Sequence, residues 1–114
     1  MEALHMALQI RLAKENIFFG PGVLTLLKLT KQHESLNAAA KSMNMSYSKA
    51  YKMIKCAEEA LNFKLLDRKI GGSGGGGSTI TTECNEFLEQ YLLFEHEIKL
   101  ISNELFEKYF KKYI

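Results

Sequence analysis

The stretch that most constrains the fold is residues 46–61, SYSKAYKMIKCAEEAL, because its side chains divide between two faces of a helix. At about 100° per residue, its apolar side chains gather on one side: Ala50, Met53, Ile54, Ala57, Ala60 and Leu61. The other side carries Ser48, Tyr51, Lys52 and Lys55, with Tyr47 and Lys49 on its flanks. No acid precedes Glu58, and Ser46 is suited to cap the first turn. The pattern predicts a helix with one buried face and one cationic, hydroxyl-rich face.

Such a face fits phosphates and base edges in a DNA major groove, although most helices with outward lysines are simply solvated. The preceding residues favour the DNA interpretation. Asn37 is an expected N-cap for a short helix, and the three alanines at 38–40 allow close helix packing. Asn44 falls at the turn, where asparagine tolerates a left-handed backbone. Helix, short turn and helix together predict a helix-turn-helix over about residues 35–61.

Residues 64–82 predict a β-wing that follows the second helix. Leu65, Leu66 and Ile70 interleave with Asp67, Arg68 and Lys69, and a return strand covers residues 79–81. Between them, residues 71–78 contain six glycines and two serines. An engineered flexible linker has this composition too. A nucleotide-binding loop is unsupported because no Gly-Lys-Ser/Thr follows. The flanking strands favour a wing whose backbone N–H groups approach DNA phosphates.

Two segments carry a family resemblance: SLNAAAKSMNMSYSKAYKMI at 35–54 and LNFKLLDRKIGGSGGGGSTIT at 61–81. They resemble the N-terminal DNA-binding domain of the ModE-type molybdate-responsive regulators, a winged helix related to the LysR-type regulators. The resemblance covers roughly residues 20–95. It implies a homodimeric bacterial or archaeal transcription regulator that binds operator DNA. In that family a molybdate-binding region follows the winged helix, and the chain has no room for it before Ile114, so molybdate binding is not expected.

The N-terminal residues predict a strand and then a helix. Residues 7–13 alternate, with Leu8, Ile10 and Leu12 on one side, which is typical of a half-buried strand. Gly20-Pro21-Gly22 then interrupts the pattern, and a core helix is expected over residues 21–33 with proline in its first turn.

The last third predicts one long helix, with Thr81 or Thr82 as its N-cap. Apolar residues recur at alternating intervals of three and four, as in a coiled-coil seam: Cys84, Phe87, Tyr91, Phe94, Ile98, Ile101 and Leu105. A helix of about 30 residues spans roughly 45 Å. Because so small a winged helix cannot cover that length, we expect the six seam residues from Phe87 to Leu105 to form a dimer interface.

Composition excludes several other classes of protein. The net charge of +2 conceals a basic middle: residues 28–69 hold nine Lys or Arg against four acids, whereas residues 70–114 hold four against seven. Cys56, Cys84 and the three histidines lack metal-ligand spacing, so no metal or cofactor is expected. No apolar run approaches the length of a membrane span. A cytoplasmic protein that does not contact membranes is expected.

The expected fold is mainly α with a small β-wing: a winged helix-turn-helix over residues 1–82 and a dimerisation helix over residues 83–114. The expected function is transcription regulation by a DNA-bound dimer; an alternative is a winged-helix protein-interaction module that does not bind DNA. An enzyme is not expected, and a chain of this size leaves little space for an effector pocket. Base-edge or nearby phosphate contacts are assigned to Tyr47, Ser48, Lys49 and Lys52, with Ser46 as cap. Backbone contacts are assigned to Ser35, Asn37, Tyr51, Lys55, Arg68, Lys69, Gly72, Gly74, Gly75 and Gly76.

Overall fold

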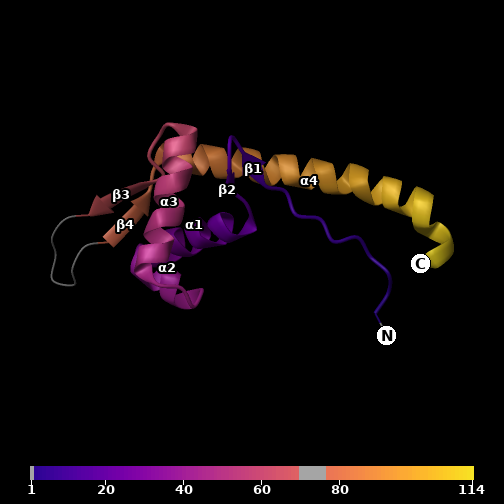
Figure 1. The fold of residues 1–114 in the computed structure, drawn as a ribbon, viewed down its shortest axis with the longest axis horizontal. Coiled ribbons are helices and arrows are strands. Elements are labelled where there is room, and N and C mark those ends of the chain that lie inside the picture. Colours follow the sequence, from indigo (N-terminus) through magenta and orange to yellow (C-terminus); the bar gives the residue numbers. More distant parts are fainter. Residues whose placement is uncertain (1, 70–76) are drawn as a thin grey trace.

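A computed structural model describes residues 2–69 and 77–114. Three helices form a head with a two-stranded wing on one side, and a long C-terminal helix extends away from it (Figure 1). This confirms the expected class, mainly helical with a small β-wing. In chain order the elements are β1 (Leu12–Ala13), β2 (Ile17–Phe19), α1 (Pro21–His33), α2 (Leu36–Ser42), α3 (Tyr47–Leu61), β3 (Leu66–Lys69), β4 (Gly77–Ile80), α4 (Thr82–Phe110) and the 3-10 turn η1 (Lys111–Tyr113).

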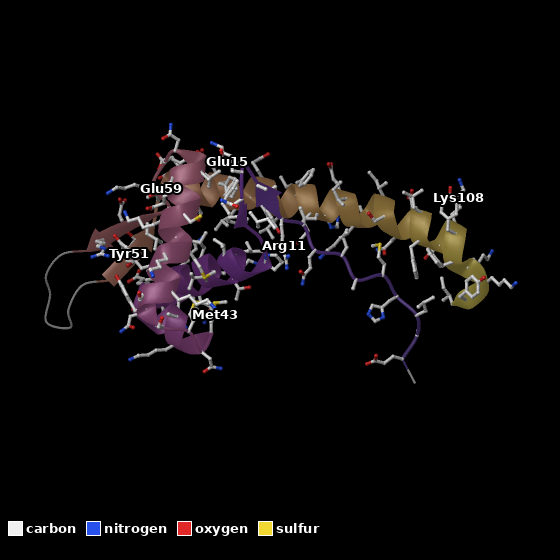
Figure 2. All side chains as sticks on the ribbon, in the orientation of Figure 1. Arg11, Glu15, Met43, Tyr51, Glu59 and Lys108 are labelled. Atoms are coloured by element: carbon white, nitrogen blue, oxygen red, sulfur yellow. The ribbon has the colours of Figure 1, made fainter. Side chains whose placement is uncertain are left out.

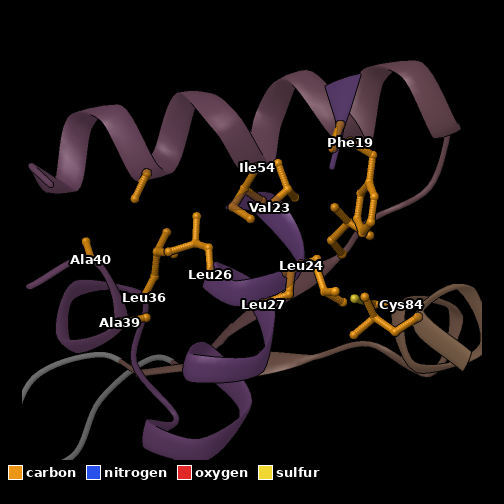
Figure 3. Close-up of a cluster of buried hydrophobic side chains, with 14 of the residues drawn as sticks. Phe19, Val23, Leu24, Leu26, Leu27, Leu36, Ala39, Ala40, Ile54 and Cys84 are labelled. Carbon is orange, nitrogen blue, oxygen red and sulfur yellow. The ribbon is translucent and has the colours of Figure 1, made fainter. Parts of the chain in front are cut away.

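The core lies where α1 packs against α2 and α3 (Figure 3). Leu26 and Leu27 of α1 are fully buried, as expected for a central core helix. The buried positions of α2 and α3 include four alanines, each fully buried: Ala39, Ala40, Ala50 and Ala57. These small side chains allow the helices to pack closely, and the large leucines of α1 fill the core beside them.

The helix ends correct one expectation and confirm two. The side chain of Ser46 accepts from the backbone N–H of Lys49 at 3.1 Å, so it caps α3 as predicted. The expected cap of α2, Asn37, was wrong: Ser35 fills that place and accepts from the N–H of Ala38 at 3.0 Å. Asn37 therefore lies inside the first turn, exposed to solvent. Asn44 adopts the left-handed conformation, with φ of 55°, between α2 and α3.

The strand expected over residues 7–13 is wrong in extent. Only Leu12–Ala13 forms a strand, and it pairs with β2 of the same hairpin. The alternation itself is present, because Leu8, Ile10 and Leu12 are half-buried while Gln9 and Arg11 are exposed. The residues before β1 run beside α4 (Figure 1), where the Tyr91 hydroxyl donates to the carbonyl of Ile10 at 2.6 Å. The alternating residues before β1 therefore lie against helix α4 rather than against another strand.

The first turns of α4 belong to the core of the head. Thr81 caps the helix by accepting from the N–H of Cys84 at 3.0 Å. Cys84 is fully buried, and this burial, assisted by the Glu58 carboxylate and opposed by Lys31, raises the pKa of its thiol to about 12. The thiol is therefore neutral at physiological pH and acts as a small apolar side chain.

Two of the six residues expected at a dimer interface, Phe87 and Tyr91, contact the Phe19 ring of the same chain. The Phe19 ring lies 4.9 Å from that of Phe87 and 4.8 Å from that of Tyr91, measured between centroids. Tyr91 is buried, and this burial, together with the Glu95 carboxylate, raises the pKa of its hydroxyl, which stays a donor. Beyond Tyr91 the helix leaves the head. Ile98 is half-buried, whereas Phe94 is 48%, Ile101 57% and Leu105 50% exposed.

Candidate nucleic-acid interface

The outward side of α3 presents three lysines together with tyrosine and serine side chains, and we call this surface the basic face: Tyr47, Ser48, Lys49, Tyr51, Lys52 and Lys55. All six side chains are exposed, and the first acid of the helix is Glu58, in its last turn. The opposite side carries the buried Ala50, Ile54 and Ala57, so the rotation of the helix about its axis is set by the core. The apolar positions therefore hold the basic face toward solvent.

An aromatic and cationic cluster connects the basic face to the wing. The rings of Tyr47 and Tyr51 stack with centroids 6.2 Å apart. Arg68 of β3 donates from Nη2 to the Tyr47 hydroxyl at 3.1 Å, and its guanidinium lies 5.3 Å from the centre of the Tyr51 ring. Lys55 approaches the same ring at 5.6 Å. Figure 2 shows Tyr51 between α3 and the wing strands. The wing and the basic face thus present one joint surface.

Glu58 fixes the base of the wing, a role that sequence reasoning missed. Its Oε2 accepts from the backbone N–H of Leu65 at 2.8 Å and more weakly from that of Leu66 at 3.4 Å. Its Oε1 lies 3.5 Å from Nζ of Lys55. Charge-assisted bonds to backbone N–H groups are stronger than neutral ones, so the carboxylate holds the start of β3 against the end of α3. The sequence feature that could have indicated this role is the position of Glu58, an acid in the last turn of the basic helix α3.

Two further contacts hold the return strand. The Thr81 hydroxyl donates to the carbonyl of Lys64 at 2.6 Å, and its backbone N–H donates to Leu65 at 3.0 Å. The N–H of Ser78 donates at 3.0 Å to the carbonyl of Glu34, the left-handed residue that ends α1. The wing is therefore hydrogen-bonded to α3, to α4 and to the end of α1.

The remaining predicted DNA contacts are distributed unevenly. Ser35 is half-buried with its hydroxyl engaged in capping, and Asn37 is exposed. Lys69 ends β3, with its backbone opposite Gly77. A Cβ at Gly77 would lie 2.7 Å from the carbonyl oxygen of Glu34, so glycine is required where β4 passes α1. The predictions for Gly72, Gly74, Gly75 and Gly76 fall on residues that the structure does not describe.

Neither a metal centre nor a membrane-spanning helix finds support in the described part of the chain. Within residues 2–69 and 77–114, no three His, Cys, Asp or Glu side chains come together as metal ligands. Over the same ranges, no helix combines the length and apolar character needed to cross a bilayer.

Comparison with known proteins identifies the family. A model of the family described as "Bacterial regulatory helix-turn-helix protein, lysR family" matches residues 23–83, from α1 to the first turn of α4. The chain belongs to the LysR-type regulatory helix-turn-helix family. Its match is thus to a family of regulators rather than to any class of enzyme.

Curated relatives narrow this LysR-type domain to the ModE branch. The transcriptional regulator ModE of Haemophilus influenzae is 32% identical over 108 residues, which is 91% of this chain and 42% of the relative. The DNA-binding transcriptional dual regulator ModE of Escherichia coli K12 is 28% identical over 78 residues, 68% of this chain and 30% of the relative. The molybdenum transport protein ModE of Herbaspirillum seropedicae is 35% identical over 63 residues, which is 55% of this chain and 23% of the relative. The chain therefore corresponds to the N-terminal helix-turn-helix domain of ModE-type regulators and spans less than half the length of each relative.

Glu58 offers a direct test of how the wing is held. Replacing Glu58 by alanine leaves the N–H groups of Leu65 and Leu66 without their acceptor, so we expect a loss of about 1–3 kcal/mol in the free energy of unfolding. Glu59→Ala is the matched control, since the neighbouring Glu59 is exposed. Urea unfolding measures both variants. Equal stability of the two would show that the carboxylate does not hold the wing.

Proposed function

We propose that this domain binds duplex DNA as the sequence-reading part of a bacterial transcription regulator in the cytoplasm. The observation that carries the proposal is the basic face, free of acids over its first three turns and continuous with Arg68 of the wing. A major groove about 12 Å wide admits an α-helix presented in this way. The regulatory family and the DNA-binding ModE relative support the same function.

The geometry suggests different roles for different parts of this surface. Ser48, Lys49 and Lys52 make no hydrogen bond with the rest of the described chain through their side chains, so they are free to read base edges or nearby phosphates. Tyr47 lies beside them, with its hydroxyl held by Arg68. Arg68 and Tyr51, stacked together, are proposed to hold the DNA backbone. Lys55, Ser35, Asn37, Lys69 and the glycines of the wing are proposed to add backbone contacts.

We further propose that two copies associate through the distal half of α4. The 29-residue helix spans roughly 44 Å at 1.5 Å per residue, and only its first turns contact the head. The radius of gyration of 17.3 Å exceeds the value of about 13 Å usual for a compact chain of this length. Phe94, Ile98, Ile101 and Leu105 keep the four–three–four spacing of a coiled-coil seam. A monomer would leave the exposed Phe94, Ile101 and Leu105 in water, whereas a second copy would bury them.

Two lysines of the basic face test the DNA assignment. We expect Lys52→Ala and Lys49→Ala each to weaken binding to duplex DNA. A lysine that contacts phosphate alone lowers affinity about equally for all sequences and reduces the salt slope by about one unit. One that reads a guanine edge costs about 1–3 kcal/mol and relaxes the preference at one base pair. Fluorescence anisotropy at several salt concentrations separates the two cases.

The matched control is Lys108→Ala, which removes the same charge from the last turn of α4, far from the basic face (Figure 2). We expect its affinity for DNA to equal that of the parent chain. Unchanged affinity in both Lys49 and Lys52 variants would refute the assignment of α3. Absence of salt-dependent binding to random duplex would favour the alternative, a winged helix that recognises a protein and does not bind DNA.

The seam is tested by Ile101→Asp, which places a charge in the proposed interface where water cannot hydrate it. Sedimentation velocity should show a dimer for the parent chain and a monomer for the variant. Asn103→Asp introduces the same charge about half a turn away and should remain dimeric. A parent chain that is monomeric at tens of micromolar would contradict the proposed interface.

A further inference from the structure

A groove of about 740 Å³ lies on the side of α3 away from the wing. The β1–β2 hairpin and the start of α1 form one wall, and α3 forms the other; we call this the β2–α3 groove. Arg11 and Tyr51 mark the two sides of α3 in Figure 2. Gly22 keeps the groove open, because a Cβ there would have only Met53 Cε within 4 Å, at 3.9 Å. The volume is in the range of small-molecule sites, although the sequence predicts little space for an effector.

The lining combines an apolar surface with cations. Ile17 (59% exposed), Phe18 and Met53 present apolar area to the groove. Arg11 belongs to the lining as well, with its aliphatic stem against Gly20 and its Nη2 donating to Oε1 of Gln9 at 2.9 Å. Lys49 and Lys52 add two cations from α3, and no residue of the lining is acidic. This charge pattern complements an anion that also carries an apolar body.

A DNA phosphate alone accounts for only part of these features. It would pair with Lys49 or Lys52, but it would leave the apolar side chains of Ile17 and Phe18 in water. An aromatic carboxylate would cover those side chains and place its charge among the cations. It would also contact Ser48, Lys49 and Lys52, three residues that the proposed function assigns to DNA binding. Ligand and DNA would therefore compete for the same cations.

We propose that the β2–α3 groove binds a small amphipathic organic anion of the aryl carboxylate class, and that its occupancy weakens DNA binding. The second part rests on the proposed function. Binding of the anion does not depend on the proposed function, so each of the two parts can be refuted without the other.

The probe is 2-naphthoate, with 2-naphthamide as its uncharged counterpart of nearly the same shape. Titration followed by ¹H–¹⁵N NMR should shift the amides of Ile17, Phe18, Gly22 and Met53 saturably. We expect naphthoate to bind about fivefold more tightly than naphthamide, the scale of one solvent-screened ion pair. No saturable shift at these amides, or equal affinity for the two compounds, would overturn the proposal.

Substitutions in the groove provide controls that leave the basic face intact. Gly22→Leu fills the groove from an exposed position of α1, and we expect it to weaken naphthoate binding at least about tenfold, as befits loss of the apolar contact area. Ile17→Ser removes an exposed apolar side chain and gives the same test should Gly22→Leu fail to fold. Arg11→Gln should weaken binding about threefold, whereas Lys28→Gln, exposed on α1 outside the groove, should not change it. Parent-like naphthoate affinity in Gly22→Leu, Ile17→Ser and Arg11→Gln would overturn the site.

Competition is measured on the same proteins. Saturating naphthoate should raise the apparent Kd of the parent chain for duplex DNA at least about threefold, as expected for two ligands that share cations. Gly22→Leu should bind DNA normally and ignore naphthoate. DNA affinity unaffected by a groove that NMR shows to be full would overturn the regulatory part alone. Failure to bind DNA without naphthoate would instead contradict the proposed function.

Discussion

The close approach of three helices through small side chains is the constraint on which the rest of the structure depends. Ala39 and Ala40 of α2 and Ala50 and Ala57 of α3 are fully buried, and these two helices pack against each other and against α1. A larger side chain at any of these positions would force packed helices apart, because a well-packed core accommodates added volume poorly. The direction of the basic face therefore follows from methyl groups on the other side of the same helix. The proposed interface and the core thus lie on opposite faces of the same helix, α3.

The wing adds a second level of control. Hydrogen bonds accepted by the Glu58 carboxylate and the Glu34 carbonyl, and donated by Thr81, hold its two strands to three different helices. Arg68 then reaches back to Tyr47 and stacks on Tyr51, so a strand side chain helps to position the aromatic part of the basic face. Preorganisation of this kind reduces the side-chain ordering that binding would otherwise require. The wing base thus supports the proposed DNA surface before any DNA arrives.

Short-range features could be predicted from the sequence. The Ser46 cap, the left-handed Asn44 and the division of α3 into two faces depend on residues within about a turn of one another. Where two local signals competed, prediction failed. Ser35 and Asn37 are both good N-cap residues two positions apart, and the structure has Ser35 as the cap of α2.

Long-range features could not be predicted from the sequence. The alternation at residues 7–13 indicated a strand but not its partner, which is the side of α4. Glu58 and Arg68 act across 7 and 21 residues of chain, and the β2–α3 groove joins three separate segments. The apolar periodicity of α4 is readable from the sequence. Which turns of the helix pack against the head is not, because that depends on the position of Phe19.

The most direct test of the central claim is methylation interference on a duplex selected by this protein from a random library. Methylation of guanine N7 blocks the major groove, whereas methylation of adenine N3 blocks the minor groove. If α3 of each of two copies lies in the major groove, N7 methylation should abolish binding in two clusters about 10 base pairs apart, or a multiple of that spacing. Interference confined to adenine N3, or absent at every guanine, would contradict the account.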